Sequence, residues 1–296
     1  MTVLGQLFVT YKTSVGRRER TTAALEDAIV RFLQTPGVPA DPRRLTADHL
    51  VAFLATLWKR QLRPSSVNHY QRAVNEWIRW LFKRGSVTWD FTREVDTVRV
   101  PMERMRMVTN DVMARMLTAA IAPPVKGGRR PNRERNVALL RLMFDTGLRR
   151  GELTTLRYDD IDLRNNVLRL RGAETKDSEW RLVPFSTSTR HALLEYNLVR
   201  RQQIAEDPGV YFRCDNGAPI SASAINQTIQ ALRTIAGVDV SAHSFRAGAI
   251  ARMRKGGLDV LTVMSVVGHN SPTMTRRYSG DTEKQAAVDA WHQRFG

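Results

Sequence analysis

The chain has little cysteine and no long apolar run, and each absence removes a class of protein. Its 296 residues include one cysteine, Cys214, so no internal disulfide can form. With one cysteine and 6 histidines, no zinc-ligand spacing is present, and we expect no metal. No stretch approaches about 18 consecutive apolar residues, and the first residues lack the apolar segment of a signal peptide. We therefore expect a cytoplasmic protein without a membrane partner.

Two phosphate-handling patterns are also missing from the sequence. There is no glycine-rich P-loop to hold a nucleotide, and no cluster of acidic residues suited to magnesium. We therefore expect no cofactor, and any chemistry has to come from side chains.

Positive charge is what the chain has in excess. It carries 46 basic and 29 acidic residues, a net charge of +17, and 39 of the basic residues are arginine. A basic surface attracts polyanions and gains by releasing their counterions, and the guanidinium fork fits phosphate oxygens. This favours nucleic acid as the partner; the alternative is an arginine content inherited from a GC-rich genome.

The first third of the chain reads as a small helical bundle. Residues 24–34 and 47–60 carry apolar side chains at helical spacing, and so do residues 65–83. Pro64 favours the start of this third helix, and the polar, glycine-containing stretch after Lys83 favours its end.

An extended, charged stretch then separates two domains. We predict a helical DNA-binding domain at 1–90, a linker at 91–106 and a second domain at 107–296. The net charge is +7 for residues 1–104 (17 basic, 10 acidic) and +10 for the remainder (29 basic, 19 acidic). Because both parts are basic, two domains forming a C-shaped DNA clamp are favoured over one basic tail.

The second domain is predicted to be mainly helical. Thr109 can cap a helix, and an apolar helix is expected from Val137 to Thr146. Two β-like runs, residues 167–172 and 180–185, predict a hairpin with Lys176 near its tip. The predicted class is therefore mainly α with a small antiparallel β-sheet (α+β).

A basic loop precedes that apolar helix. Five of its side chains are candidates for contact with a phosphate backbone, although charges in such loops are mostly solvated. They are Lys126, Arg129, Arg130, Arg133 and Arg135.

Four short polar motifs of the second domain carry side chains suited to phosphodiester cleavage. Cleaving a phosphodiester requires a nucleophile, fixed positive charge around the phosphate oxygens and a proton donor for the leaving oxygen. Glu152 follows Arg149 by three residues, a spacing that lets its carboxylate hold a guanidinium on one helix face. Taken singly, each residue has a structural explanation: an ion pair between Arg149 and Glu152, a helix cap at His243 and a solvated charge at Lys176. The candidate catalytic residues, taken together, are Arg149, Glu152, Lys176, His243, Arg246, His269 and Tyr278.

The order of these motifs resembles that of a known family. TGLRRGEL, TK with RLVP, HSFRAG and VVGHNSPTMTRRY are similar to the ordered motifs of the tyrosine recombinases, also called the phage integrase family. The resemblance covers about residues 104–290, and the helical first part resembles the core-binding domain of that family. The bundle is under way by residue 24, so we expect the simple type without an arm-binding domain.

The resemblance implies a covalent mechanism. Tyr278 would attack the scissile phosphate and form a 3′-phosphotyrosyl bond. Lys176 would protonate the departing 5′-oxygen, and His243 would handle the proton of the tyrosine. Because the phosphotyrosyl bond conserves the energy of the broken bond, neither metal nor ATP is required.

The resemblance also implies a cationic cradle for the transition state. Arg149, Arg246 and His269 would hold the phosphate oxygens, with Glu152 as an orienting carboxylate. One departure lies beside this set, because many relatives have a bulkier residue where Ala247 follows Arg246, which puts the packing there in question.

Partners follow from the same resemblance. We expect a double-stranded DNA core site, a tetramer on DNA held by a C-terminal docking helix at about 281–295, and a directionality factor as an accessory. The site of action would be the bacterial nucleoid or the cytoplasm of a phage-infected host. The expected DNA contacts are Arg63, Arg72, Arg79, Arg129 and Arg130.

Two other functions use the same fold. A type IB topoisomerase would nick and close one duplex without exchange, and an inert DNA-binding regulator would lack a catalytic residue. Complete motifs and the tail after Tyr278 favour the recombinase. Integration of a viral genome, resolution of DNA dimers and cassette movement all fit the motifs.

Overall fold

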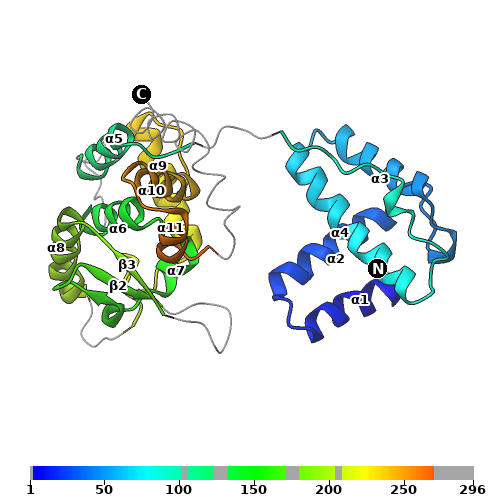
Figure 1. Ribbon diagram of the computed structural model, residues 1–296, viewed down its shortest axis with the longest axis horizontal. Helices are drawn as coiled ribbons and strands as arrows, with labels where there is room; N and C mark the ends of the chain where they lie inside the picture. Colours follow the sequence, from blue (N-terminus) through cyan, green and yellow to red (C-terminus); the bar gives the residue numbers. More distant parts are fainter. Residues whose placement is uncertain (1–2, 102–105, 123–132, 171–179, 204–208, 270–296) are drawn as a thin grey trace, which may run out of the picture. The chain divides into compact units, whose positions relative to one another are not determined.

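The computed structural model describes residues 3–101, 106–122, 133–170, 180–203 and 209–269. The chain divides into two compact units, Met1–Glu103 and Arg104–Gly296, each with its own apolar core (Figure 1). None of the described helices combines the length and the apolar character that a bilayer crossing requires.

The first unit is a helical bundle. Its elements are α1 (Val3–Ser14), α2 (Glu19–Leu33), the 3-10 turn η1 (Pro42–Arg44), α3 (Ala47–Lys59), α4 (Pro64–Lys83) and the 3-10 turn η2 (Phe91–Arg93). The ring of Phe32 meets Phe53 edge-on at 5.4 Å and Trp77 at 6.2 Å, and all three side chains are buried. Burial of large apolar side chains from three helices holds the bundle together, at about 1.5 to 3 kcal/mol for each.

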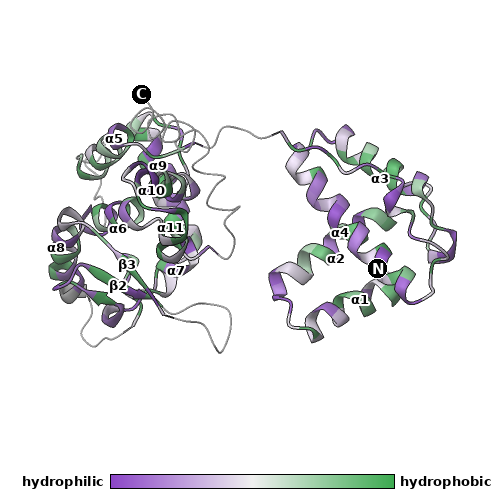
Figure 2. Cartoon of the chain, in the orientation of Figure 1, coloured by the Kyte–Doolittle hydropathy of each residue, from purple (hydrophilic) through white to green (hydrophobic). Residues whose placement is uncertain are grey.

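Helix α4 confirms the start and end expected from the sequence. Pro64 occupies the first turn, where a missing N–H costs nothing, and the helix ends at Lys83, two residues before Gly85. Single helices of this unit contain both hydrophilic and hydrophobic residues (Figure 2), as the spacing of apolar residues predicts for amphipathic helices.

Two parts of the first unit differ from the sequence expectation. Helix α1 was not expected, yet Phe8 from this helix is fully buried. Residues 91–98, expected in the linker, instead pack on the bundle: Phe91 is fully buried, and Gln71 donates to Asp96 O (2.8 Å) and accepts from the N–H of Val98 (2.8 Å). Those bonds satisfy an extended backbone that hydrophobic periodicity does not identify.

The second unit surrounds a central helix. Its described helices are α5 (Asn110–Ile121), α6 (Arg133–Thr146), α7 (Arg150–Thr155), the 3-10 turn η4 (Tyr158–Asp160), α8 (Thr187–Gln203), α9 (Ala222–Ala236), α10 (Ala242–Lys255) and α11 (Val260–Val267). Helix α6 packs against α5, α8 and α10 (Figure 1). The hydroxyl of Thr109 accepts from the N–H of Val112 at 3.3 Å, so the expected cap of α5 is confirmed.

The sheet of this unit has three short antiparallel strands. They are β1 (Ile161–Asp162), β2 (Val167–Leu170) and β3 (Arg181–Pro184), in the order β1-β2-β3. Leu168 faces Val183 and Leu170 faces Arg181, so the expected pairing of the two runs is confirmed. Leu168 and Val183 are fully buried, which places this face of the sheet against the core.

A small satellite core joins the start of the second unit to α10 and α11. Ala247, Ile250, Val263 and Val267 are buried there, and Met107 packs against them. Ala247, the residue that departs from the family pattern, is fully buried in this small core.

Candidate active site

A glycine turn between α6 and α7 brings Arg149 beside α10. Gly147 has a φ of +62°, and a Cβ at this position would lie 3.0 Å from the Cβ of Ala249 and 3.4 Å from the Cα of Arg246. Only glycine combines that backbone conformation with so close an approach. The turn therefore sets the spacing between the two arginines of the predicted set.

Glu152 holds Arg149 in two ways. Its carboxylate accepts the backbone N–H of Arg149 (2.7 Å), which caps α7, and the Nη1 of Arg149 (3.3 Å). The side chain of Glu152 is 13% exposed and that of Arg149 is 46% exposed. The carboxylate thus holds one nitrogen of the Arg149 guanidinium, while nearly half of the side chain remains exposed to solvent.

Arg246 is buried at the foot of the site. It is 4% exposed, and its guanidinium donates to Gly147 O (2.8 Å) and to Val267 O (2.6 Å). His243 lies one turn earlier on α10 and is exposed. An open depression of about 270 Å³ is lined by Arg149, His243 and Arg246, among others.

Arginine side chains donate to the carbonyl oxygens at the C-terminal end of α11. Gly268 ends this helix with a φ of +68°, and its carbonyl oxygen accepts from Arg149 Nη2 at 2.5 Å. A helix C-terminus carries partial negative charge, so guanidinium groups are stabilised there. Two of the predicted arginines meet at this end, through Val267 and Gly268.

His269 follows that helix end and is 6% exposed. Burial lowers the pKa of His269 to about 4, and the positive charges of Arg246 and Arg149 act in the same direction, with smaller contributions from His243 and Arg181. The imidazole is therefore neutral at pH 7. A neutral imidazole has one N–H donor to offer a phosphate oxygen and one nitrogen that accepts.

One residue at this site was missed in the sequence. Arg181 begins β3 and donates to Glu152 Oε1 (2.7 Å) and to Val266 O (3.1 Å). It belongs to the quoted RLVP run, but nothing in that run separates it from an ordinary strand residue. Only the packing of β3 beside α7 and α11 reveals its contacts.

Several predicted residues lie outside the described residues. They are Lys126, Arg129, Arg130, Lys176, Tyr278 and the docking helix at 281–295. Among the described residues, the structure brings together Arg149, Glu152, His243, Arg246 and His269.

The predicted DNA contacts of the first unit separate into two places. Arg72 and Arg79 lie seven residues apart on α4 and are both exposed, so they share a face. They line an open depression of about 930 Å³ together with Arg20 and His69. Arg63 is exposed but lies outside this depression, at the residue before α4.

The expectation that Arg135 contacts phosphate is wrong. The residue lies in α6, is 8% exposed, and donates to Arg213 O (2.9 Å) and Asp215 Oδ1 (3.2 Å). Helix α6 begins at Arg133, earlier than the sequence pattern indicates, so Arg133 and Arg135 belong to the helix and not to the basic loop.

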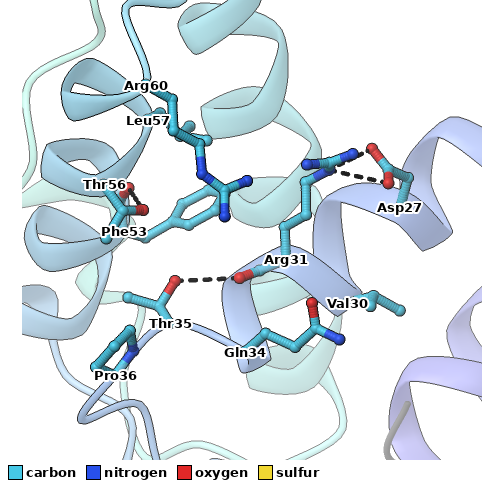
Figure 3. Close-up of a pocket in the computed structure, with 10 residues that line it drawn as sticks. All are labelled: Asp27, Val30, Arg31, Gln34, Thr35, Pro36, Phe53, Thr56, Leu57 and Arg60. Carbon is cyan, nitrogen blue, oxygen red and sulfur yellow. Dashed lines mark hydrogen bonds and ion pairs between the residues drawn. The ribbon is translucent and has the colours of Figure 1, made fainter.

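A hollow of about 320 Å³ in the first unit is lined by residues of α2, α3 and the loop after α2 (Figure 3). The Nε of Arg31 donates to both oxygens of Asp27 (2.9 and 2.8 Å), and the hydroxyl of Tyr70 also donates to Asp27. These groups satisfy one another, and we assign no reaction to the hollow.

The site of the second unit combines three arginines, Arg149, Arg181 and Arg246, with the neutral His269 and the exposed His243. Such a set can neutralise the charge of a phosphate, donate a hydrogen bond to it and move a proton beside it. Phosphoryl transfer is the chemistry that this arrangement suits.

Comparisons with known proteins point the same way. A model of the phage integrase family matches residues 106–285. The chain is 28% identical to a tyrosine recombinase XerC of Roseiflexus castenholzii over 79% of this chain and 74% of the relative. It is also 28% identical to a tyrosine recombinase XerD of Bifidobacterium longum, over 89% of this chain and 87% of the relative.

Solved structures share the fold at lower identity. The Tn1549 transposon integrase in complex with transposon right end DNA is similar with a TM-score of 0.76 and 16% identity, over 100% of both chains. A lambda integrase dimer bound to a core site is similar with a TM-score of 0.74 and 15% identity, over 94% of this chain and 95% of the other.

Proposed function

Because the chain belongs to the phage integrase family and is a tyrosine-type site-specific DNA recombinase, we propose that Tyr278 is its nucleophile and that the cluster at the end of α11 is its phosphate site. The observation that carries this proposal is the convergence of Arg149, Arg246 and His269 on the end of α11, where Gly268 precedes Tyr278 by ten residues.

The reaction proceeds by transfer of the phosphoryl group to the tyrosine. The Oη of Tyr278 attacks the scissile phosphorus, a 3′-phosphotyrosyl bond forms, and the bond to the 5′-oxygen breaks. Lys176 supplies the proton to that leaving oxygen, and His243 accepts the proton of the phenol, whose ordinary pKa is near 10. Attack by a 5′-hydroxyl of another strand then releases the tyrosine and completes the exchange.

Arg149, Arg246 and His269 stabilise the transition state in different ways. Arg246 is held in place by two carbonyl oxygens, while Arg149 lines the depression with a side chain that is 46% exposed. Neutral His269 contributes a hydrogen bond to a non-bridging oxygen. Because these groups are fixed before DNA binds, little reorganisation is needed during the reaction.

Strand exchange beside the native flanking DNA tests this function. We propose integration of a viral genome as the role, with a directionality factor for the reverse reaction. Cells that express the protein beside its own flanking DNA should yield recombinant junctions, and sequencing them identifies the crossover site. Junctions that join two replicon copies would indicate resolution of DNA dimers, and junctions that join cassette ends would indicate cassette movement. The absence of any junction would contradict recombinase function.

We further propose that both units contact DNA, the first through Arg72 and Arg79. Replacing both by alanine should weaken binding and reduce the log-log salt slope by about 2, since each neutralised phosphate contributes about 0.9. Binding to a core-site duplex is measured by fluorescence anisotropy over a series of salt concentrations.

Arg43→Ala is the matched control, because Arg43 is an exposed arginine of the same unit that pairs with Asp41 at 3.0 Å. Arg63→Ala tests the remaining predicted contact. An unchanged slope in the double variant would assign Arg72 and Arg79 to the solvated surface.

We propose that a tetramer on DNA is held by the helix expected at 281–295. Trp291 and Phe295 lie four residues apart, so they share one helix face, and burying them against a neighbouring copy contributes several kcal/mol at about 25 cal/mol per Å². A head-to-tail contact of this kind closes into a ring. Trp291→Ala with Phe295→Ala should therefore keep single-site binding and abolish complexes that hold two duplexes.

Gel-shift analysis separates one-duplex from two-duplex complexes. Gln293→Ala serves as the control, since the proposed helix would place this residue on the face opposite Trp291 and Phe295. Normal strand exchange by the double variant would show that the helix does not join the copies.

A further inference from the structure

Arg181 lies at the junction of three elements of the active site. It is the first residue of β3, where its side chain shares the inner face of the sheet with Val183, two residues further along. The side chain is 14% exposed, although arginine side chains usually reach solvent. Its burial calls for specific partners.

The first partner is Glu152. Arg181 Nη2 donates to Glu152 Oε1 at 2.7 Å, and Arg149 Nη1 donates to the same oxygen at 3.3 Å. Two guanidinium groups therefore share one carboxylate, and Arg181 makes the shorter contact. Without it, the buried carboxylate would have Arg149 as its remaining guanidinium partner and would draw that group toward itself, away from Gly268 O.

The second partner is the carbonyl end of α11. Arg181 Nε donates to Val266 O at 3.1 Å, one residue before the carbonyl that Arg246 holds and two before the one that Arg149 holds. The guanidinium also fills the space beside Gly268, where a Cβ would lie 2.8 Å from Arg181 Nη1. His269 follows that glycine directly, so the position of Arg181 bears on the position of the imidazole.

We infer that Arg181 is a positioning residue, which sets the places of Arg149 and His269 around the scissile phosphate without touching the phosphate itself. The inference rests on the proposed function of this site. It depends on the planar fork of arginine, because Nε and Nη2 reach two partners at once and a lysine ammonium is a single point of charge. Displacing reacting groups by about 1 Å can cost roughly 100-fold in rate.

Single-turnover cleavage of a nicked suicide duplex by the full chain tests this inference. Arg181→Ala should lower the cleavage rate at saturating protein by up to about 100-fold with an unchanged dissociation constant for DNA, and Arg181→Lys should recover part of that rate. A loss confined to DNA binding would overturn the inference, and so would cleavage at the wild-type rate.

Arg135→Ala is the matched structural control. Arg135 is also a nearly buried arginine of the second unit, and it pairs with Asp215 instead of with the site. It should lower the thermal stability of the protein while the folded fraction cleaves at the wild-type rate. Equal cleavage defects in Arg135→Ala and Arg181→Ala would assign Arg181 to folding alone.

A double-mutant cycle identifies the route of the effect. If Arg181 acts through Glu152, the loss caused by Arg181→Ala should be much smaller in a Glu152→Gln background, because residues that act as a unit are not additive. Fully additive losses would overturn this route. Cleavage by the wild-type chain is the reference. If the wild-type chain does not cleave, the proposed function is contradicted. If it cleaves and the Arg181 variants cleave at the same rate, only the inference about Arg181 is contradicted.

Discussion

Tyr278→Phe is expected to bind its DNA site as the wild type does and to form no covalent complex with it. The substitution removes one oxygen, the proposed nucleophile, and keeps the aromatic ring. Loss of a nucleophile has cost on the order of 10⁶-fold in a covalent enzyme, so no adduct should be detectable. The measurement is trapping on a nicked suicide duplex followed by denaturing electrophoresis, with gel shift as the binding assay.

Tyr158→Phe is the matched control for this experiment. Tyr158 belongs to the same unit, is half-buried and lies beside Tyr211 with ring centroids 6.2 Å apart. It should leave adduct formation intact. A covalent adduct formed by Tyr278→Phe would assign the nucleophile to another residue and remove the proposed mechanism.

Arg246→Lys is expected to lower the cleavage rate by at least about 100-fold, the typical cost of losing one preorganised transition-state contact. Lysine keeps the positive charge, but its donors all lie on one nitrogen and cannot reproduce the planar fork whose Nη1 and Nη2 donate to Gly147 O and Val267 O. DNA affinity should change little, because one phosphate contact among many is altered. Single-turnover cleavage at saturating protein measures the effect.

Arg246→Ala adds a cost in stability. It leaves two buried carbonyl oxygens without this donor, at about 1 to 3 kcal/mol for each unsatisfied group. Thermal unfolding therefore accompanies the cleavage assay, and Arg164→Ala, a change at an exposed arginine of the β1–β2 turn, controls for general loss of charge. Wild-type cleavage by either Arg246 variant would exclude this residue from the phosphate site.

Local patterns predicted much of the fold. The boundaries of α4, the cap at Thr109 and the pairing of β2 with β3 depend on residues within a few positions of each other. Proline at a helix start, a hydroxyl at a cap and apolar periodicity act over that range. Such features were therefore predictable. Helix α1, the early start of α6 and the packing of residues 91–98 do not follow from such local signals.

The candidate site was only partly predictable for the same reason. The contact between Arg149 and Glu152 spans three residues on a helix start and follows from spacing. Contacts that join distant segments do not: Arg181 reaches Glu152 across 29 residues, and Arg149 reaches Gly268 across 119. The packing of β3, α7 and α11 creates them.

Composition and local patterns are enough to predict the basic charge, the helical bundle with its following α+β unit, and the order of motifs that marks the family. Which charged groups are buried depends on the packing of distant segments. It placed Arg135 in a structural ion pair instead of on DNA, packed residues 91–98 on the first unit and made Arg181 part of the site. It also holds His269 neutral, since burial and cations from separate elements lower its pKa to about 4. The physical reason is that secondary structure responds to near neighbours, whereas burial and charge pairing respond to every segment that the fold brings together.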